Sequence, residues 1–156
     1  GSEMCIRDRS WYAMYYIDSH LSDVNKIEQA AYRIGLKLFG SLQRSMIAAM
    51  RQYGFYSMEE FQVMKKEADG YVNWTYRTGD GWLIGAEMVG HILHDCKKVL
   101  AVQPFGCMPN HICGRGLYPS IQQKLPEGRI VSADVDSGSS KLNVYNRARM
   151  LVDMHI

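Results

Sequence analysis

Two short runs of β-branched and other apolar residues constrain the fold of this chain more than any other feature. Residues 99–102, VLAV, follow two lysines and precede a proline, and residues 129–133, RIVSA, lie between a glycine and an aspartate. Each run has the length and composition of a buried strand. A helical pattern ending near Leu125 connects them, and such a helix-containing crossover joins parallel strands with a right-handed turn. We therefore predict two parallel strands.

Helical patterns surround these two runs. Apolar residues recur at steps of three and four over 23–51, which predicts a long helix with one buried face. A capping box beginning at Ser57 predicts a second helix that ends before Gly70. Further helices are expected over 82–94 and 140–154.

This order of elements predicts the α/β class. A helical segment over 11–72 would precede a partial Rossmann-like unit over 73–156, which is ordered helix, strand, helix, strand, helix. Two parallel strands do not make an independent sheet, because parallel sheets are covered on both faces, so we expect a fragment of a larger fold. Residues 1–10, GSEMCIRDRS, fit neither the helical nor the strand pattern and are interpreted as a sequencing or translation artefact. Cys5 lies among them and is therefore not a candidate functional residue.

Composition excludes several classes of function. The chain is 47% hydrophobic and 22% charged with a formal charge of +2, and its basic residues are dispersed, so no nucleic-acid partner is expected. No apolar run has the length of a membrane span, which predicts a cytoplasmic protein without a membrane partner. Four cysteines are too few and too unevenly spaced for a secreted disulfide scaffold, so we interpret them as thiols or ligands.

Polar residues follow both predicted strands, at 105–116 and 134–140. Ligands of open α/β sheets bind at the carboxyl ends of the strands, so these two clusters are the candidate site. Cys107 lies there beside Gly106 and just before an expected helix start at Pro109, where backbone N–H groups favour a thiolate. Thiolates bind metals, and the alternative is that Cys107 is a small buried apolar residue.

The remaining candidates surround Cys107 in the two clusters. Cys113 is a weaker metal-ligand candidate, because its spacing from Cys107 fits neither a zinc motif nor a ferredoxin motif. The residues expected to line the site are Phe105, Gly106, Pro109, Asn110, His111, Asp134, Asp136, Ser139, Asn143 and Asn146. No catalytic residue is assigned among them.

Three segments resemble the C-terminal region of 2-hydroxyacyl-CoA (2-hydroxyglutaryl-CoA) dehydratase activase-related proteins. They are GDGWLIGAEM at 79–88, QPFGCMPNHICGRG at 103–116 and DVDSGSSKLNVYNRARML at 134–151. The usual forms in that family are G-E-G-W-L, Q-P-F-G-C-x-P-N-H, and D-Y-D-P-G-x-S followed by N-x-x-N-R. The sequence departs from them at Asp80, Val135 and Ser137.

The resemblance implies a segment of a multidomain protein of anaerobic metabolism, in which ATP hydrolysis drives delivery of a low-potential electron to Rossmann-like domains that hold an iron–sulfur cluster. Cys107 matches the cysteine of the family's F-G-C motif, which implies that it is a ligand of a 4Fe-4S cluster whose other ligands lie outside this chain. Pro109, Asn110 and His111 match the P-N-H that follows. The implied partners are the remaining domains of the parent protein and an acyl-CoA substrate. The chain contains no ATP-binding motif, so it is assigned no ATPase activity of its own.

Two other functions remain open at this point. The chain could be a non-catalytic Rossmann-like module that binds an acyl-CoA or nucleotide phosphate at the helix starts near Asn110 and Ser140. It could also be a purely structural module with Cys107 in its core.

Overall fold

The computed structural model describes most of the chain, namely residues 12–17, 20, 25–55, 59–76, 81–94, 96–138 and 140–154. The chain divides into two compact units, Gly1–Lys66 and Glu67–Ile156. This division falls slightly before the boundary between residues 72 and 73 that the sequence predicts.

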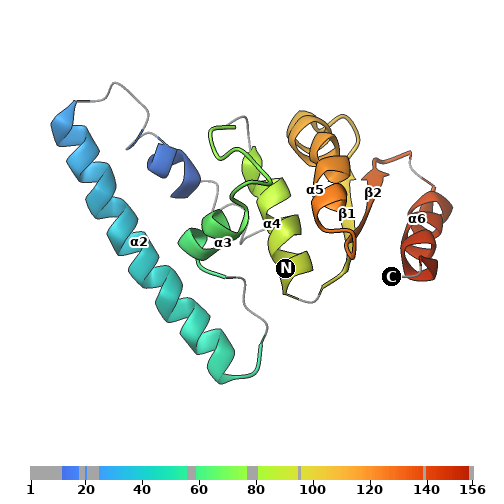
Figure 1. The fold of residues 1–156 in the computed structure, drawn as a ribbon, viewed down its shortest axis with the longest axis horizontal. Coiled ribbons are helices and arrows are strands. Elements are labelled where there is room, and N and C mark those ends of the chain that lie inside the picture. The colour runs from blue at the N-terminus through green and yellow to red at the C-terminus, as the bar shows by residue number, and fades with distance from the viewer. Residues whose placement is uncertain are drawn as a thin grey trace. The chain divides into compact units, whose positions relative to one another are not determined.

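The second unit is built around a sheet of two parallel strands (Figure 1). Strand β1 is Lys98–Pro104 and strand β2 is Arg129–Val135. Each strand contains one of the predicted runs and extends it toward the carboxyl end, so the two strands and their parallel direction are confirmed. The register pairs Gln103 with Asp134 near the ends of the strands. The unit therefore belongs to the α/β class.

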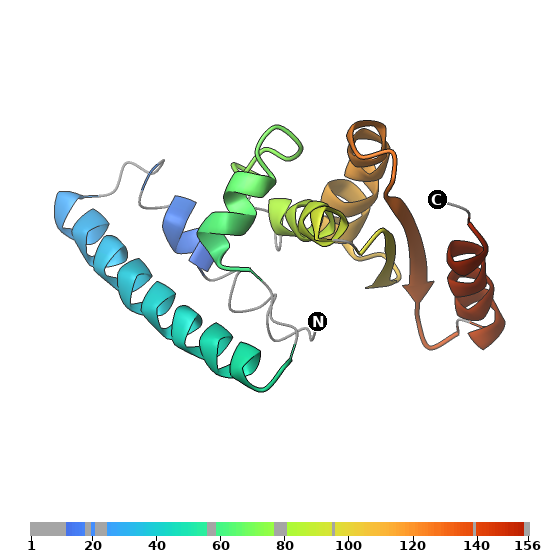
Figure 2. The same cartoon turned by 60° about the horizontal axis from the view of Figure 1, so that its bottom comes forward.

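Helices cover both faces of this sheet. Helices α4, Trp82–Leu93, and α5, Tyr118–Lys124, lie on one side, and α6, Lys141–Asp153, lies on the other (Figures 1 and 2). The connection from β1 to β2 passes through α5, as the crossover pattern predicts. The result is a sheet between two helical layers, which is the arrangement that lets parallel strands bury both faces.

The face of the sheet toward α4 and α5 changes from apolar to polar along the strands. Side chains of a strand alternate between faces, so Val99, Ala101 and Gln103 share one face of β1. Opposite them in register lie Ile130, Ser132 and Asp134. The apolar end packs into the core of the unit, and the polar end remains beside the loop that follows β1. The buried core consists of Met88, Val89, Ile92, Tyr118, Ile121, Leu125 and Ile130.

The first unit packs around Phe61 at the start of α3, Phe61–Glu67. The Phe61 side chain is only 1% exposed, and its ring centroid lies 4.4 Å from that of Tyr12 and 5.7 Å from that of Tyr16. Both tyrosines belong to a helical segment over 12–17. Aromatic packing therefore joins the short helices of this unit.

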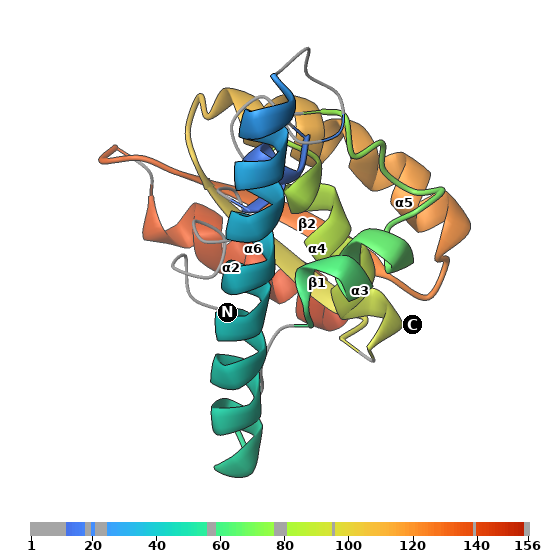
Figure 3. The ribbon, with the colours of Figure 1, turned by 90° about the vertical axis from the view of Figure 1, so that its left-hand side faces the viewer.

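The long helix α2, Lys26–Gln52, confirms the predicted helix but not its predicted burial. Figure 3 shows it as one uninterrupted helix despite its two glycines. Leu36 is the only residue of the helix that is buried, whereas the expected core row is exposed: Ile27 77%, Ile34 61%, Leu38 68%, Leu42 58% and Met46 55%. Periodicity identifies an apolar face, but it does not supply the element that covers it. Within the described part of the chain, no helix combines the length and apolarity that a bilayer span requires.

Three further expectations need correction. Helix α3 begins at Phe61, directly after the capping box and not within it, and Ser57 itself lies outside the described residues. Strand β1 is only half-buried, with Val102 59% exposed, because α6 packs mainly against β2. Helix α6 begins after Ser140, whose Oγ accepts a hydrogen bond from the backbone N–H of Leu142, but its apolar side chains Leu142, Tyr145 and Val152 are exposed.

Gly128 allows the turn before β2 to pack against α4, which yields a stability prediction. A Cβ at Gly128 would lie 2.6 Å from Cδ1 of the buried Ile92, whereas a Cβ at Gly116 would have no atom within 4 Å. We expect Gly128→Ala to lower the free energy of unfolding by about 1–3 kcal/mol through overpacking. Gly116→Ala, the matched control, should not lower it. Urea unfolding measures both, and equal stability of the two variants would show that this close approach is not a constraint.

Candidate functional site

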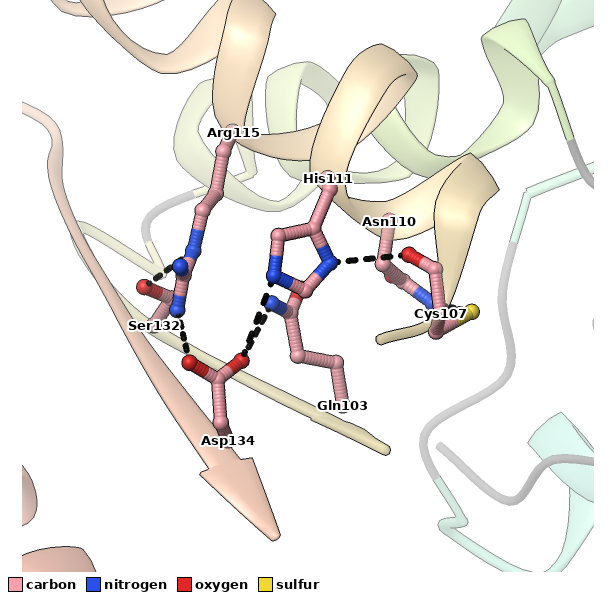
Figure 4. Close-up of polar contacts among 7 residues, drawn as sticks. All are labelled: Gln103, Cys107, Asn110, His111, Arg115, Ser132 and Asp134. Carbon is pink, nitrogen blue, oxygen red and sulfur yellow. Dashed lines mark hydrogen bonds and ion pairs between the residues drawn. The ribbon is translucent and has the colours of Figure 1, made fainter. Parts of the chain in front are cut away.

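The carboxylate of Asp134 joins both strands to the helical segment after β1 (Figure 4). Gln103 Nε2 donates a hydrogen bond to Asp134 Oδ1 at 2.6 Å. Arg115 Nη2 donates to Asp134 Oδ2 at 2.5 Å, and Arg115 Nε donates to Ser132 Oγ at 3.0 Å. We call Gln103, His111, Arg115, Ser132 and Asp134 the Asp134 cluster. It lies at the carboxyl ends of the two strands, where the sequence predicts a site.

Hydrogen bonds and charge keep Asp134 ionised. The hydrogen bond from Gln103 is the largest cause that lowers the pKa of the Asp134 carboxyl below its ordinary value. Partial burial acts in the opposite direction, while the hydrogen bond and positive charge of Arg115 and the proximity of His111 add to the lowering. The carboxylate is therefore a fixed negative charge at neutral pH.

Gln103 is the buried polar residue of this site. Its side chain is 1% exposed, and its amide orientation is determined because the Asp134 carboxylate can only accept a hydrogen bond. Within the described residues, Gln103 Oε1 has no hydrogen-bond partner. A buried amide that is only half satisfied is costly, so the bond to Asp134 must offset the desolvation of Gln103.

Cys107 is held in a tight turn directly after β1. Gly106 has a φ of 73°, which glycine adopts without strain, and the N–H of Cys107 donates to the carbonyl of Pro104 at 3.1 Å. The Cys107 side chain is partly buried, and Asn110 Nδ2 lies 3.0 Å from its sulfur as a hydrogen-bond donor. The turn thus presents a thiol that accepts a side-chain hydrogen bond.

His111 connects the Cys107 turn to the Asp134 cluster. Its backbone N–H donates to the carbonyl of Cys107 at 3.0 Å, and its Nδ1 lies 2.9 Å from the same oxygen. That oxygen can only accept, so Nδ1 carries a proton, and Nε2 points toward Asp134 Oδ1 at 4.0 Å. Figure 4 shows the imidazole between Cys107 and Asp134.

Cys113 lies in a different environment. After Cys107 the chain forms a π-helical segment over Asn110–Gly114, then a 3-10 turn over Arg115–Leu117. Cys113 is 7% exposed, and burial raises the pKa of its thiol. Burial thus disfavours the thiolate form of Cys113. The structure thus separates Cys107, in polar surroundings, from Cys113.

The structure gathers some of the predicted site residues and leaves others outside. Asn110 and His111 meet Cys107, and His111 approaches Asp134. Phe105 is 71% exposed directly after the end of β1.

The residues that the sequence places on the last helix lie on α6, away from the Asp134 cluster. Asn143 and Asn146 are exposed on α6, which covers the opposite side of the sheet from the segment that supplies His111 and Arg115. Asp136 is exposed beyond the end of β2, and Ser139 lies outside the described residues. Of the expected residues of the third segment that the structure describes, Asp134 belongs to the Asp134 cluster.

Sequence reasoning missed Gln103, Arg115 and Ser132 as members of the site. The alternation of β2 contained a signal for Ser132, which precedes Asp134 by two residues and shares its face. Arg115 follows His111 by four residues, the spacing of one helical face. Gln103 could not be identified without the strand register. The register places Asp134 beside it, and Asp134 provides the hydrogen-bond acceptor that offsets the burial of the glutamine side chain.

The described residues contain single thiols rather than a complete metal centre. They include no group of three or more His, Cys, Asp and Glu side chains arranged to hold a metal ion. Cys96 is exposed and precedes β1, at the opposite end of the strand from Cys107. Any metal centre that involves Cys107 would need ligands from elsewhere.

Comparison with family models, curated proteins and solved structures gives no significant match to this chain. Two features of the chain therefore bear on its function. One is the geometry of the Cys107 turn and the Asp134 cluster, and the other is the family resemblance of the segments 79–88, 103–116 and 134–151.

The lowered pKa of Asp134 predicts a pH dependence of stability. In the unfolded chain this carboxyl takes up a proton near its ordinary pKa of 3.8, and in the folded chain only at lower pH. Its contribution to the free energy of unfolding is therefore complete above about pH 4 and is lost as the pH falls through the lowered pKa. Asp134→Asn should lose stability less steeply than wild type over this acid range. Urea unfolding at stepped pH measures this, with Asp136→Asn as the charge-matched control, and parallel curves for wild type and Asp134→Asn would refute it.

Proposed function

We propose that this chain is part of an activase-related 2-hydroxyacyl-CoA dehydratase-like protein of the cytoplasm, and that Cys107 supplies one ligand to an iron–sulfur cluster of the 4Fe-4S type. The observation that carries this proposal is the position of the Cys107 sulfur. It lies at the carboxyl end of β1 and accepts a hydrogen bond from Asn110. The resemblance of the segment 103–116 to the family's Q-P-F-G-C-x-P-N-H motif supports the same residue.

The surroundings of Cys107 suit a ligand thiolate. Cysteine binds a metal through its sulfur, and the groups that hydrogen-bond to a ligand help to orient it. Donors to a ligating sulfur also tune the reduction potential of iron–sulfur clusters. Asn110 is the residue positioned for this role, because its Nδ2 lies 3.0 Å from the Cys107 sulfur.

The thiol at this strand end fits a single ligand of a cluster whose other ligands come from elsewhere in the parent protein. A cubane cluster is normally held by four thiolates, and the described residues place a single thiol at this strand end. When bound, the cluster would supply low-potential electron transfer. This chain's own residues would hold one corner: Cys107 would ligate, Asn110 would donate to its sulfur, and His111 would fix the turn through the Cys107 carbonyl.

We also propose that the chain belongs to a larger Rossmann-like fold. A parallel sheet of two strands is unusually small, and Val102 on β1 is 59% exposed. In the first unit, the apolar row of α2 is exposed along the helix. Exposed apolar rows of this size are typical of surfaces that another part of a protein covers. The partners would then be the remaining domains of the parent protein, together with an acyl-CoA substrate.

The ligand role is tested by anaerobic reconstitution of the parent protein with iron and sulfide. Cys107→Ser should lower the iron and sulfide content and change the electron paramagnetic resonance spectrum of the reduced protein. Cys96→Ser is the matched control, since Cys96 is exposed at the opposite end of β1. Unchanged iron content and spectrum in Cys107→Ser would remove Cys107 from the ligand set. Tight acyl-CoA binding without any metal would instead favour a non-catalytic binding module.

The role of Asn110 is tested separately by measuring the reduction potential. Asn110→Ala should keep the iron content of the reconstituted protein but make the reduction potential more negative, because a donor to the ligating sulfur is lost. Asn143→Ala, which changes an exposed asparagine on α6, is the control and should leave the potential unchanged. Equal potentials for the two variants would show that Asn110 does not act on the cluster.

A further inference from the structure

A hollow of about 390 Å³ lies on the apolar side of the helical segment that follows Cys107. An enclosed apolar cavity of about 150 Å³ is enough to hold benzene, so this hollow has room for a small organic group. Its volume is also within the range of small-molecule pockets, roughly 300–1,000 Å³. It is lined by Tyr76, Met108, Pro109, Ile112, Cys113, Gly116 and Leu117.

The lining determines what kind of molecule would fit. Among the residues that the structure describes, the lining side chains include no acid or base of the Asp, Glu, Lys, Arg or His type. Met108 and Ile112 form an apolar rim, 56% and 62% exposed, and the thiol of Cys113 is buried. Burial raises the pKa of that thiol, so it also remains neutral. A charged group would lose its hydration here without gaining a partner of opposite charge.

The backbone that forms this hollow is unusual. Residues Asn110–Gly114 form a π-helical segment, which is rare and occurs frequently at functional sites. Gly116 contributes open space, because a Cβ at this position would meet no atom within 4 Å. Met108 and Pro109, which line the hollow, directly follow Cys107. The helical segment that follows Cys107 thus has a polar side, which faces the Asp134 cluster, and an apolar side, which lines the hollow.

We propose that this hollow binds a small uncharged apolar group, such as a short hydrocarbon chain or an aromatic ring, beside the turn that presents Cys107. The site is formed by the helical segment itself and does not require Cys107 to be a metal ligand. Under the function proposed above, it would place the apolar part of a ligand next to the reacting centre.

The test uses hexan-1-ol and toluene as probes of the full 156-residue chain. Both should cause saturable chemical-shift changes in the amides of 108–117, while hexanoate, which has the same chain length and a negative charge, should bind at least about tenfold more weakly. The same binding should persist in Cys107→Ser. Cys107→Ser separates the two proposals. Cys107 does not line the hollow, so loss of metal binding in this variant would leave the proposed apolar site unchanged.

Substitutions at Gly116 provide the matched pair for this test. Gly116→Leu places a side chain in the hollow and should weaken hexan-1-ol binding about tenfold or more, whereas Gly116→Ala should bind nearly as wild type. If Gly116→Leu does not fold, Ile112→Ser at the exposed rim should still weaken binding several-fold. Absence of saturable binding, binding that neither Gly116→Leu nor Ile112→Ser changes, or equal binding of hexanoate would overturn the proposal.

Discussion

The hydrogen-bonded ion pair between Asp134 and Arg115 is the interaction on which the arrangement of the site depends. It links the end of β2 to the helical segment after β1, and the second oxygen of Asp134 accepts from Gln103 at the end of β1. A charge-assisted bond of this kind is stronger than a bond between neutral groups. The same segment also contacts β2 through the hydrogen bond from Arg115 to Ser132 and through the approach of His111 to Asp134. The carboxylate on the neighbouring strand thus helps to hold the segment that follows the Cys107 turn.

The burial of Gln103 makes this arrangement specific. Register pairs Gln103 with Asp134, and a shift of one residue between the strands would place their side chains on opposite faces of the sheet. Gln103 would then lose the acceptor that offsets its burial. The apolar pairing of Val99 with Ile130 at the other end of the strands favours the same register. Polar and apolar contacts thus agree on one alignment of the two strands.

Much of this second unit could be predicted from the sequence, because its signals are local. The β-branched runs predict both strands, and the helical connection predicts their parallel direction, which in turn predicts that Cys107 and Asp134 lie at the same edge. Gln103 and Arg115 were missed because their roles depend on strand register and on an irregular helical turn. The apolar row of α2 was expected to be buried, since periodicity alone cannot show whether an apolar face has a covering partner. The error at α2 thus concerns long-range packing, not local structure.

The segment after Cys107 explains why two cysteines so close in sequence have different chemistry. Residues four apart share a face in this helical segment, so Cys107, His111 and Arg115 form one row. This row meets the polar ends of the strands, where His111 and Arg115 approach Asp134. The rows that begin at Met108 and Pro109 instead pass through Ile112 and Cys113 and line the apolar hollow. The same period therefore places Cys107 toward the polar ends of the strands, where its sulfur accepts a hydrogen bond from Asn110, and places the thiol of Cys113 among apolar side chains.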